Sequence, residues 1–158
     1  MNYFFYKTVI GEIGIVEDGS AIVRIVFGSA SIAGEPSESP LLAEAAGQIS
    51  LYLEGRLKSF SLPLDPRGTP FMRVVWKALL AIPYGGTASY SDIAAAVGNP
   101  KACRAVGMAN NRNPIPLIIP CHRVIGKNGS LTGYAGGLEI KKRLLSIEAG
   151  VSSHVHLL

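Results

Sequence analysis

The chain has 158 residues, of which 48% are hydrophobic, and it carries a formal net charge of +4. It can form one domain or two small ones, and it lacks the run of about 18 apolar residues that a membrane-spanning helix needs. Two cysteines are too few for a disulfide framework, and they show no metal-ligand spacing with the three histidines. With no signal peptide evident, we expect a cytoplasmic protein without metal, other cofactor or membrane partner.

The charge is distributed unevenly along the chain. Residues 1–65 contain four lysines and arginines against eight acidic residues, whereas residues 66–158 contain eleven against three. The basic half favours a polyanionic partner such as nucleic acid, although a basic surface that serves only solubility is an alternative. The segment 63–68, rich in proline and glycine, lies where the charge changes. We therefore predict two domains, 1–65 and 66–158.

The first domain is predicted to be a small unit of strands and one helix. Asp18-Gly19 is a strong hairpin signal between two β-rich segments, and apolar residues recur at helical spacing over 41–57. The predicted strands are 3–8, 13–17, 22–27 and a shorter 59–62. No polar cluster in this half indicates a site.

The second domain is predicted to begin with an amphipathic helix. Thr69 can cap its start, and Pro70 suits its first position. The apolar stripe that follows includes Val74 and ends at Ile82, with Trp76 away from the centre of the stripe.

Two shorter helices follow and form a predicted helix-turn-helix. Ser89 and Asp92 match a capping box, and Asn99-Pro100 predicts that the next helix begins there. This second helix, 101–111, has several small side chains, and Arg104 projects from its first turns. A thin helix with one long cation suits a nucleic-acid groove, whereas close packing of an ordinary helix pair would also explain the small residues.

Residues 113–124 form the most distinctive segment. The apolar run 115–119 contains one proline and is flanked by two more. We predict it to be a buried strand, and Cys121, His122 and Arg123 follow it. A cysteine beside His and Arg can be stabilised as a thiolate. Free cysteine is also among the most buried residue types, so this segment alone is compatible with either a nucleophile or core packing.

The chain ends in a glycine-rich loop, a helix and a tail. The loop 131–137 lacks the pattern of a phosphate-binding loop. The helix 138–148 is predicted to expose Lys141, Lys142 and Arg143. Glu148 lies at its C-terminus, where the helix dipole disfavours an acid unless a partner such as protonated histidine is present; a solvated glutamate is the alternative. The tail holds His154 and His156, whose spacing does not establish a metal site.

The segment Ile119-Pro120-Cys121-His122-Arg123-Val124 resembles the signature of the O6-alkylguanine-DNA alkyltransferases. The resemblance covers 67–150, whereas residues 1–65 resemble the family only in architecture. The other matching positions are Tyr90, Asn99-Pro100-Lys101, Arg104-Ala105-Val106-Gly107, Asn113-Pro114, Gly133-Tyr134, Gly136-Gly137-Leu138, Leu144-Leu145 and Glu148. This resemblance implies an α+β protein of two domains, an N-terminal RNase H-like α/β unit and a mostly helical C-terminal domain with a helix-turn-helix.

The resemblance also implies DNA repair by direct reversal. The family transfers the alkyl group of O6-alkylguanine, and of O4-alkylthymine, to its own cysteine in one turnover after nucleotide flipping. By this resemblance Cys121 is the acceptor, His122 is its base through a water, and Glu148 orients and charges His122. The implied partner is the minor groove of double-stranded DNA containing O6-alkylguanine, bound by a monomer without a cofactor.

Further residues receive roles only through this resemblance. Tyr90 gives a proton to the departing base, Asn113 holds backbone around the cysteine, and Arg104 fills the space that the flipped nucleotide leaves. The resemblance also implies DNA contacts for Ala102, Ala105, Tyr90, Arg112 and Arg123, and a guanine pocket of Tyr134, Ala135, Val124 and Gly136. Ala135 stands where some members have serine, so its contact to O6 would come from the backbone.

Two other functions are compatible with parts of the pattern. A Cys–His–Glu set can serve a cysteine hydrolase, which would turn over many times, whereas an alkyltransferase acts once. A DNA-binding module without transfer, as in alkyltransferase-like proteins, is disfavoured because those proteins lack the cysteine that is present here as Cys121.

Overall fold

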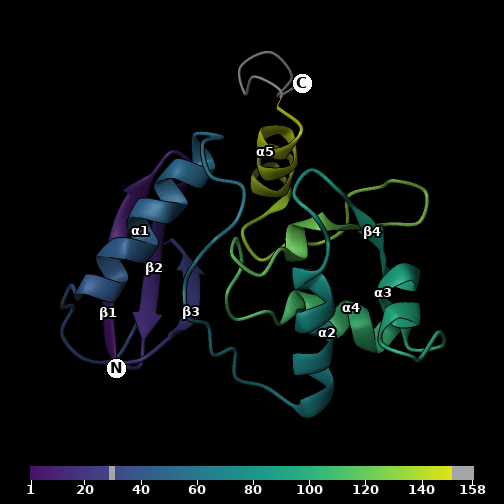
Figure 1. The fold of residues 1–158 in the computed structure, drawn as a ribbon, viewed down its shortest axis with the longest axis horizontal. Coiled ribbons are helices and arrows are strands. Elements are labelled where there is room, and N and C mark those ends of the chain that lie inside the picture. The colour runs from purple at the N-terminus through teal and green to yellow at the C-terminus, as the bar shows by residue number, and fades with distance from the viewer. Residues whose placement is uncertain (29–30, 151–158) are drawn as a thin grey trace.

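Three antiparallel strands and one helix form the first unit of the computed structural model, which describes residues 1–28 and 31–150. The elements are β1 (Asn2–Thr8), β2 (Gly11–Glu17), β3 (Ile22–Phe27) and α1 (Pro40–Leu53). The sheet has the order β1-β2-β3, and α1 lies across one of its faces (Figure 1). The three longer strands, the hairpin and the helix predicted for this half are confirmed, although the helix ends at Leu53 rather than at residue 57.

The fourth predicted strand, 59–62, is wrong. The Ser61 N–H donates to the side-chain oxygen of Gln48 on α1 at 3.0 Å, and the Gln48 amide donates back to the Ser61 hydroxyl at 3.1 Å. A side chain of the helix therefore holds the backbone that a strand would have used. The chain reaches the sheet only afterwards, through a single parallel bridge between Ile22 and Leu64.

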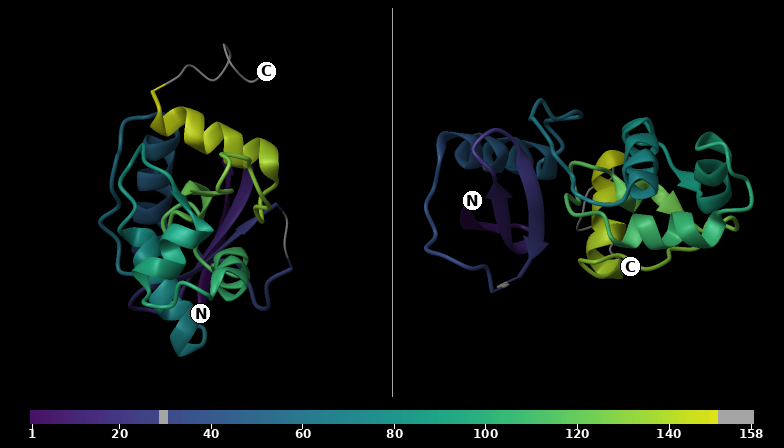
Figure 2. Two further views of the ribbon diagram at one scale, coloured as in Figure 1. Left: turned by 90° about the vertical axis from the view of Figure 1, so that its right-hand side faces the viewer. Right: turned by 90° about the horizontal axis from the view of Figure 1, so that it is seen from below.

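Helices dominate the second unit, which lies beside the first in Figure 1 and in the right-hand view of Figure 2. Its elements are α2 (Pro70–Leu80), β4 (Ala88–Ser89), α3 (Tyr90–Ala96), α4 (Cys103–Asn111), the 3-10 turn η1 (Cys121–Arg123), β5 (Val124–Ile125) and α5 (Leu138–Glu148). The short strands β4 and β5 pair in parallel. Thr69 caps α2, and Ser89 with Asp92 forms the predicted capping box of α3. Among the residues that the structure describes, no helix is long and apolar enough to cross a membrane.

The start of α4 differs from the prediction. The Asn99 carbonyl accepts the Ala102 N–H at 3.0 Å, so Pro100 and Lys101 form a turn before the helix. The helix begins at Cys103, and its N-cap residue Ala102 makes no side-chain cap. The two helices α3 and α4 still pack together as the predicted pair.

The buried face of α2 also differs from the predicted stripe. Trp76 is 1% exposed, whereas Val74 is 50% exposed. The Trp76 indole N–H donates to the Ala109 carbonyl on α4 at 2.8 Å. Because α2 packs against α4 as well as the rest of the core, its buried face is wider than the periodic stripe and includes the tryptophan.

Trp76→Phe should lower the free energy of unfolding by about 2–4 kcal/mol, because it leaves a cavity and a buried carbonyl without its donor. Urea denaturation followed by circular dichroism measures this difference. Val74→Ala on the same helix is the matched control and should change stability by less than about 0.5 kcal/mol. Equal effects of the two substitutions would contradict the packing described for Trp76.

Candidate active site

Asn113 organises the segment that leads to the cysteine. Its side-chain oxygen accepts the Ile115 N–H at 3.0 Å, and its amide donates to the Ile119 carbonyl at 2.8 Å. The predicted strand over 115–119 is wrong: the segment consists of turns, and Leu117 has a positive φ of 75°. The three prolines provide no N–H for a sheet ladder, so the Asn113 side chain supplies the bonds that fix this segment.

Cys121 lies on η1 and is 5% exposed. A cavity of about 10 Å³ adjoins it, lined among others by Asn110, Asn113, Tyr134 and Ala135. This volume is enough for about one water molecule and far too small for a purine. Burial raises the pKa of the thiol to about 11, although Asn113 and Lys141 act in the opposite direction. At neutral pH this raised pKa favours the neutral thiol, although the neighbouring His122 and Arg123 in the sequence made a stabilised thiolate one of the two alternatives.

His122 is completely buried and faces Glu148 at the end of α5. Its Nε2 lies 2.7 Å from Glu148 Oε2, and its buried Nδ1 has no hydrogen-bond partner within the described part of the chain. Burial opposes ionisation of Glu148, but hydrogen bonds from His122 and Arg123 outweigh it and lower the pKa of Glu148 to about 2. The expected histidine partner of Glu148 is thus present, and Nδ1 is the ring atom left to accept a proton.

Arg123 binds the same carboxylate instead of facing outward. It is 8% exposed, its Nε lies 2.8 Å from Glu148 Oε1, and its Nη2 lies 3.0 Å from Oε2. A third nitrogen donates to the Ile82 carbonyl at 2.7 Å. The DNA contact expected for Arg123 is not favoured by this position, because the side chain is buried and three of its five N–H groups donate inside the protein.

Lys141 is also buried, although the helical pattern predicted that it would be exposed. Its Nζ donates to the carbonyls of Val124 at 2.7 Å and Thr132 at 3.0 Å. Burial lowers the pKa of this amine, and the nearby Cys121 acts in the opposite direction. Lys141 therefore ties α5 to β5 and to the glycine-rich loop beside the cysteine.

The glycine-rich loop closes over the cysteine. The ring of Tyr134 packs against Phe27 of β3 at 5.7 Å and lies edge-on to His122 at 6.5 Å. The Tyr90 hydroxyl forms a short hydrogen bond with the Thr132 hydroxyl. Of the four residues expected to form the guanine pocket, Val124 is buried, Tyr134 and Gly136 are half-buried, and Ala135 is exposed.

The residues expected to contact DNA lie on the α3–α4 side of the second unit, apart from Arg123. Arg104, Ala105 and Arg112 are exposed, whereas Ala102 and Tyr90 are half-buried. Arg104 and Ala105 belong to the first turns of α4, and Arg112 follows its last residue. The helix-turn-helix therefore presents small residues and two cations together.

Tyr52 of α1 is the site residue that the sequence did not reveal. Its hydroxyl donates to Glu148 Oε2 at 2.5 Å and lies 3.1 Å from His122 Nε2, although 96 and 70 positions separate these residues. In the sequence it occupies an apolar position of the helix, so it counts as a core residue. The only available signal was that a buried tyrosine hydroxyl usually needs a hydrogen-bond partner.

No group of three or more potential metal ligands occurs among residues 1–28 and 31–150. His154 and His156 lie outside the described residues.

Comparison with known proteins assigns both units. Residues 1–66 match the ribonuclease-like domain of 6-O-methylguanine DNA methyltransferase, and residues 70–150 match the DNA binding domain of the same family. The chain belongs to the 6-O-methylguanine DNA methyltransferase family. The predicted α+β class with an RNase H-like first unit is confirmed, and so is the activity: DNA repair by transfer of an alkyl group to a cysteine of the protein itself. The hydrolase alternative is not favoured.

Named relatives and solved structures agree with this family. A constitutive methylated-DNA–protein-cysteine methyltransferase of Bacillus subtilis is 51% identical and aligns with 94% of this chain and 96% of its own. A methylated-DNA–protein-cysteine methyltransferase of Methanosarcina acetivorans is 49% identical, over 94% of this chain and 98% of its own. The crystal structure of Mycobacterium tuberculosis OGT in complex with DNA has a TM-score of 0.87 at 42% identity, over 95% of this chain and 94% of that one.

Glu148→Gln should lower the free energy of unfolding by about 3–5 kcal/mol at neutral pH, because it leaves the buried Arg123 without its counter-charge. The carboxylate has a pKa of about 2 in the folded protein against an ordinary value of 4.5. The contribution of the carboxylate to the free energy of unfolding is therefore complete above about pH 4.5 and is lost as the pH falls towards 2. Urea denaturation between neutral and acidic pH should show the difference between the two proteins shrinking over this range.

Glu139→Gln is the matched control for this substitution. Glu139 is in the first turn of the same helix, its side chain is 84% exposed, and its contact with Lys142 is 3.9 Å. Such a surface pair contributes little, so this variant should match the wild type within about 0.5 kcal/mol. A Glu148→Gln protein as stable as the control would contradict the network.

Proposed function

We propose that this family member transfers an alkyl group from O6 of guanine in double-stranded DNA, and from O4 of thymine, to Sγ of Cys121. The single observation that carries this assignment is the buried thiol beside His122, whose Nε2 is held by Glu148 while Nδ1 stays unbonded in the described structure. The cavity at Cys121 has room for about one water. The proposal includes a water that passes the thiol proton to Nδ1 of the adjacent His122 in the reacting complex. The thiol therefore loses its proton to His122 only during the reaction, and no permanent thiolate is needed.

The step balances in atoms and electrons. The sulfur electron pair forms a bond to the alkyl carbon, the carbon–oxygen bond breaks, and the guanine leaves with the electron pair of that bond. Tyr90 supplies a proton to the departing base and becomes a phenolate, and His122 takes the thiol proton and becomes an imidazolium, so the two charges cancel. The product is a thioether, from which no group in this site can regenerate the thiol, so each chain acts once.

The base must enter a closed pocket. A cavity of about 10 Å³ cannot admit guanine, so the loop 131–137 with Tyr134 moves when the flipped nucleotide arrives. Tyr90 must also give up its hydrogen bond with Thr132 before it can donate to the base. Val124, Ala135 and Gly136 then line the opened pocket together with Tyr134.

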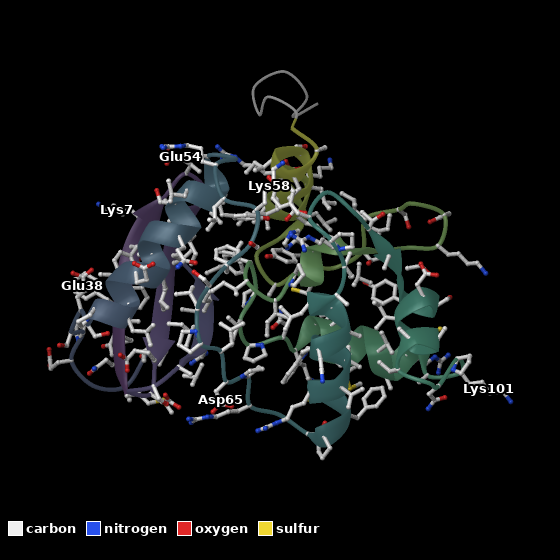
Figure 3. All side chains as sticks on the ribbon, in the orientation of Figure 1. Lys7, Glu38, Glu54, Lys58, Asp65 and Lys101 are labelled. Atoms are coloured by element: carbon white, nitrogen blue, oxygen red, sulfur yellow. The ribbon has the colours of Figure 1, made fainter. Side chains whose placement is uncertain are left out.

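The α3–α4 pair supplies the DNA-binding surface. Arg104 and Arg112 are exposed there, and the small side chains of α4 suit the narrow minor groove. Figure 3 shows Lys101 at this end of the molecule and the acidic Glu38 and Glu54 on the first unit, away from it. DNA that binds at α4 therefore avoids the acidic half, and under this proposal Arg104 fills the gap left by the flipped base.

The protein acts as a monomer in the cytoplasm under this proposal. The thiol, the histidine, the carboxylate and the asparagine all come from one chain, so a single copy contains the whole relay. A thiol that must stay unoxidised until it meets DNA requires a reducing compartment, and Cys103 and Cys121 are both free.

Incubation with duplex DNA carrying O6-methylguanine should add one methyl group per chain, on the peptide that contains Cys121. Peptide mass spectrometry measures the site and the stoichiometry. Cys121→Ala should still bind the duplex and acquire no methyl group, and unmodified duplex should give none with the wild type. Folded protein that binds the damaged duplex without methylation of Cys121 would refute the proposal.

Arg104→Ala should weaken repair of duplex DNA by roughly tenfold, because one minor-groove contact contributes about 1–3 kcal/mol. Reaction with free O6-benzylguanine, which needs no flipping, should keep its rate. Lys142→Ala removes an exposed cation on α5, outside α4, and is the matched control that should leave both rates unchanged. An equal loss in the two reactions of Arg104→Ala would contradict the flipping role.

A further inference from the structure

We propose that Tyr52, which belongs to the first unit, is a positioning residue of the transfer reaction: its hydroxyl keeps the hydrogen of neutral His122 on Nε2 and so leaves Nδ1 as the base for Cys121. This inference rests on the proposed function and adds a component to it. It also gives the ribonuclease-like unit a direct part in the chemistry of the second unit.

The position of the Tyr52 hydroxyl is fixed by burial and by neighbouring rings. Tyr52 is 0% exposed, and its ring packs against Phe60 at 5.3 Å and edge-on to Tyr84 at 6.3 Å. The hydroxyl meets Glu148 Oε2 at 2.5 Å and His122 Nε2 at 3.1 Å. The rings of Phe60 and Tyr84 hold the Tyr52 ring in place, so its hydroxyl is directed at His122 and Glu148.

The hydrogens in this cluster can be arranged in one way. Glu148 is ionised because its pKa is about 2, so its oxygens only accept. Burial and the charge of Glu148 raise the pKa of Tyr52, which therefore remains a phenol with one hydrogen to donate. That hydrogen goes to Glu148 in the 2.5 Å contact, which leaves the phenol oxygen as an acceptor.

His122 Nε2 consequently faces two acceptors, at 2.7 Å and 3.1 Å. It must carry a hydrogen to avoid repulsion from both, and a neutral imidazole has only one N–H. Nδ1 is then unprotonated, and none of the described residues occupies it as a donor or an acceptor. The tyrosine oxygen thus acts together with the Glu148 carboxylate to disfavour the tautomer in which Nδ1 is protonated and cannot act as a base.

The hydroxyl also stabilises the relay after proton transfer. Its oxygen points at the imidazolium and its hydrogen at the carboxylate, so it favours the charged form of each. The charged and titratable groups around His122 are Glu148, Arg123, Lys141, Cys121, Tyr134 and Tyr84. Burial lowers the pKa of His122, Glu148 raises it, and Arg123 and Lys141 lower it further. Loss of the Tyr52 hydroxyl should therefore weaken the base.

Tyr52→Phe tests this role through the pH dependence of single-turnover reaction with free O6-benzylguanine. At about pH 7 the variant should react roughly tenfold more slowly, as expected for loss of a hydrogen bond to a charged group. The deficit should shrink as the pH approaches the thiol pKa of about 11, because hydroxide then forms the thiolate without His122. A deficit that is the same at every pH, or no deficit, would overturn the proposal.

Two further proteins separate positioning from packing. Tyr84→Phe removes a neighbouring hydroxyl that donates to the Ile147 carbonyl at 3.4 Å, and it should keep the wild-type profile. Tyr52→Phe combined with His122→Gln should be no slower than His122→Gln alone, because Tyr52 acts through His122. Additive losses would indicate a packing role only.

Nitrogen NMR of His122 in the wild-type protein tests the tautomer without any variant. A protonated Nε2 and an unprotonated Nδ1 at neutral pH are expected, and the reverse would overturn the proposal even if Tyr52→Phe failed to fold. Failure of the wild type to become alkylated would instead refute the proposed function, so the two hypotheses can be distinguished.

Discussion

A single buried carboxylate holds the site together. Glu148 accepts hydrogen bonds from Tyr52, His122, Arg123 and the Gly85 N–H, so three separate segments meet at the end of α5. Burying an ionised carboxylate is costly unless charges and donors surround it. The chain can therefore place this glutamate inside only when both units have folded and joined. The cost that the helix dipole imposes at this position is offset by Arg123 and His122.

The same site keeps its cysteine inactive until it is needed. A thiol with a pKa of about 11 in a cavity of about 10 Å³ reacts slowly with oxidants and with stray electrophiles. In the proposed mechanism, activation depends on Nδ1 of His122, which receives the proton only when an alkyl group is in place to be attacked. For a protein that can react once, a low background reactivity preserves the molecules that remain. A neutral resting thiol is thus better suited to this chemistry than a permanent thiolate.

The sequence predicted what depends on periodicity and local capping. The first three strands, the caps at Thr69 and Ser89, and the bounds of α5 follow from such patterns. The sequence-based prediction failed where a side chain forms the hydrogen bonds that a neighbouring strand would otherwise form. The Asn113 side chain does this for residues 115–119. The prediction also failed for two cations: the resemblance implied a DNA contact for Arg123, and the helical pattern indicated an exposed Lys141. Each is instead satisfied by groups that are distant in sequence or belong to a loop. The polar role of Tyr52 was missed because a tyrosine at an apolar position of a periodic helix counts as a core residue.

One hydrophobic cluster runs through both units, with Ile49 of α1 and Leu144 of α5 among its members. The helix α5 adds a polar link, since Arg143 donates to the Val9 carbonyl in the first unit at 2.7 Å. A boundary that is clear in charge and composition is therefore not a boundary in folding. Denaturation should be cooperative across it, and a perturbation of the distant sheet changes the population of chains whose thiol is competent to react.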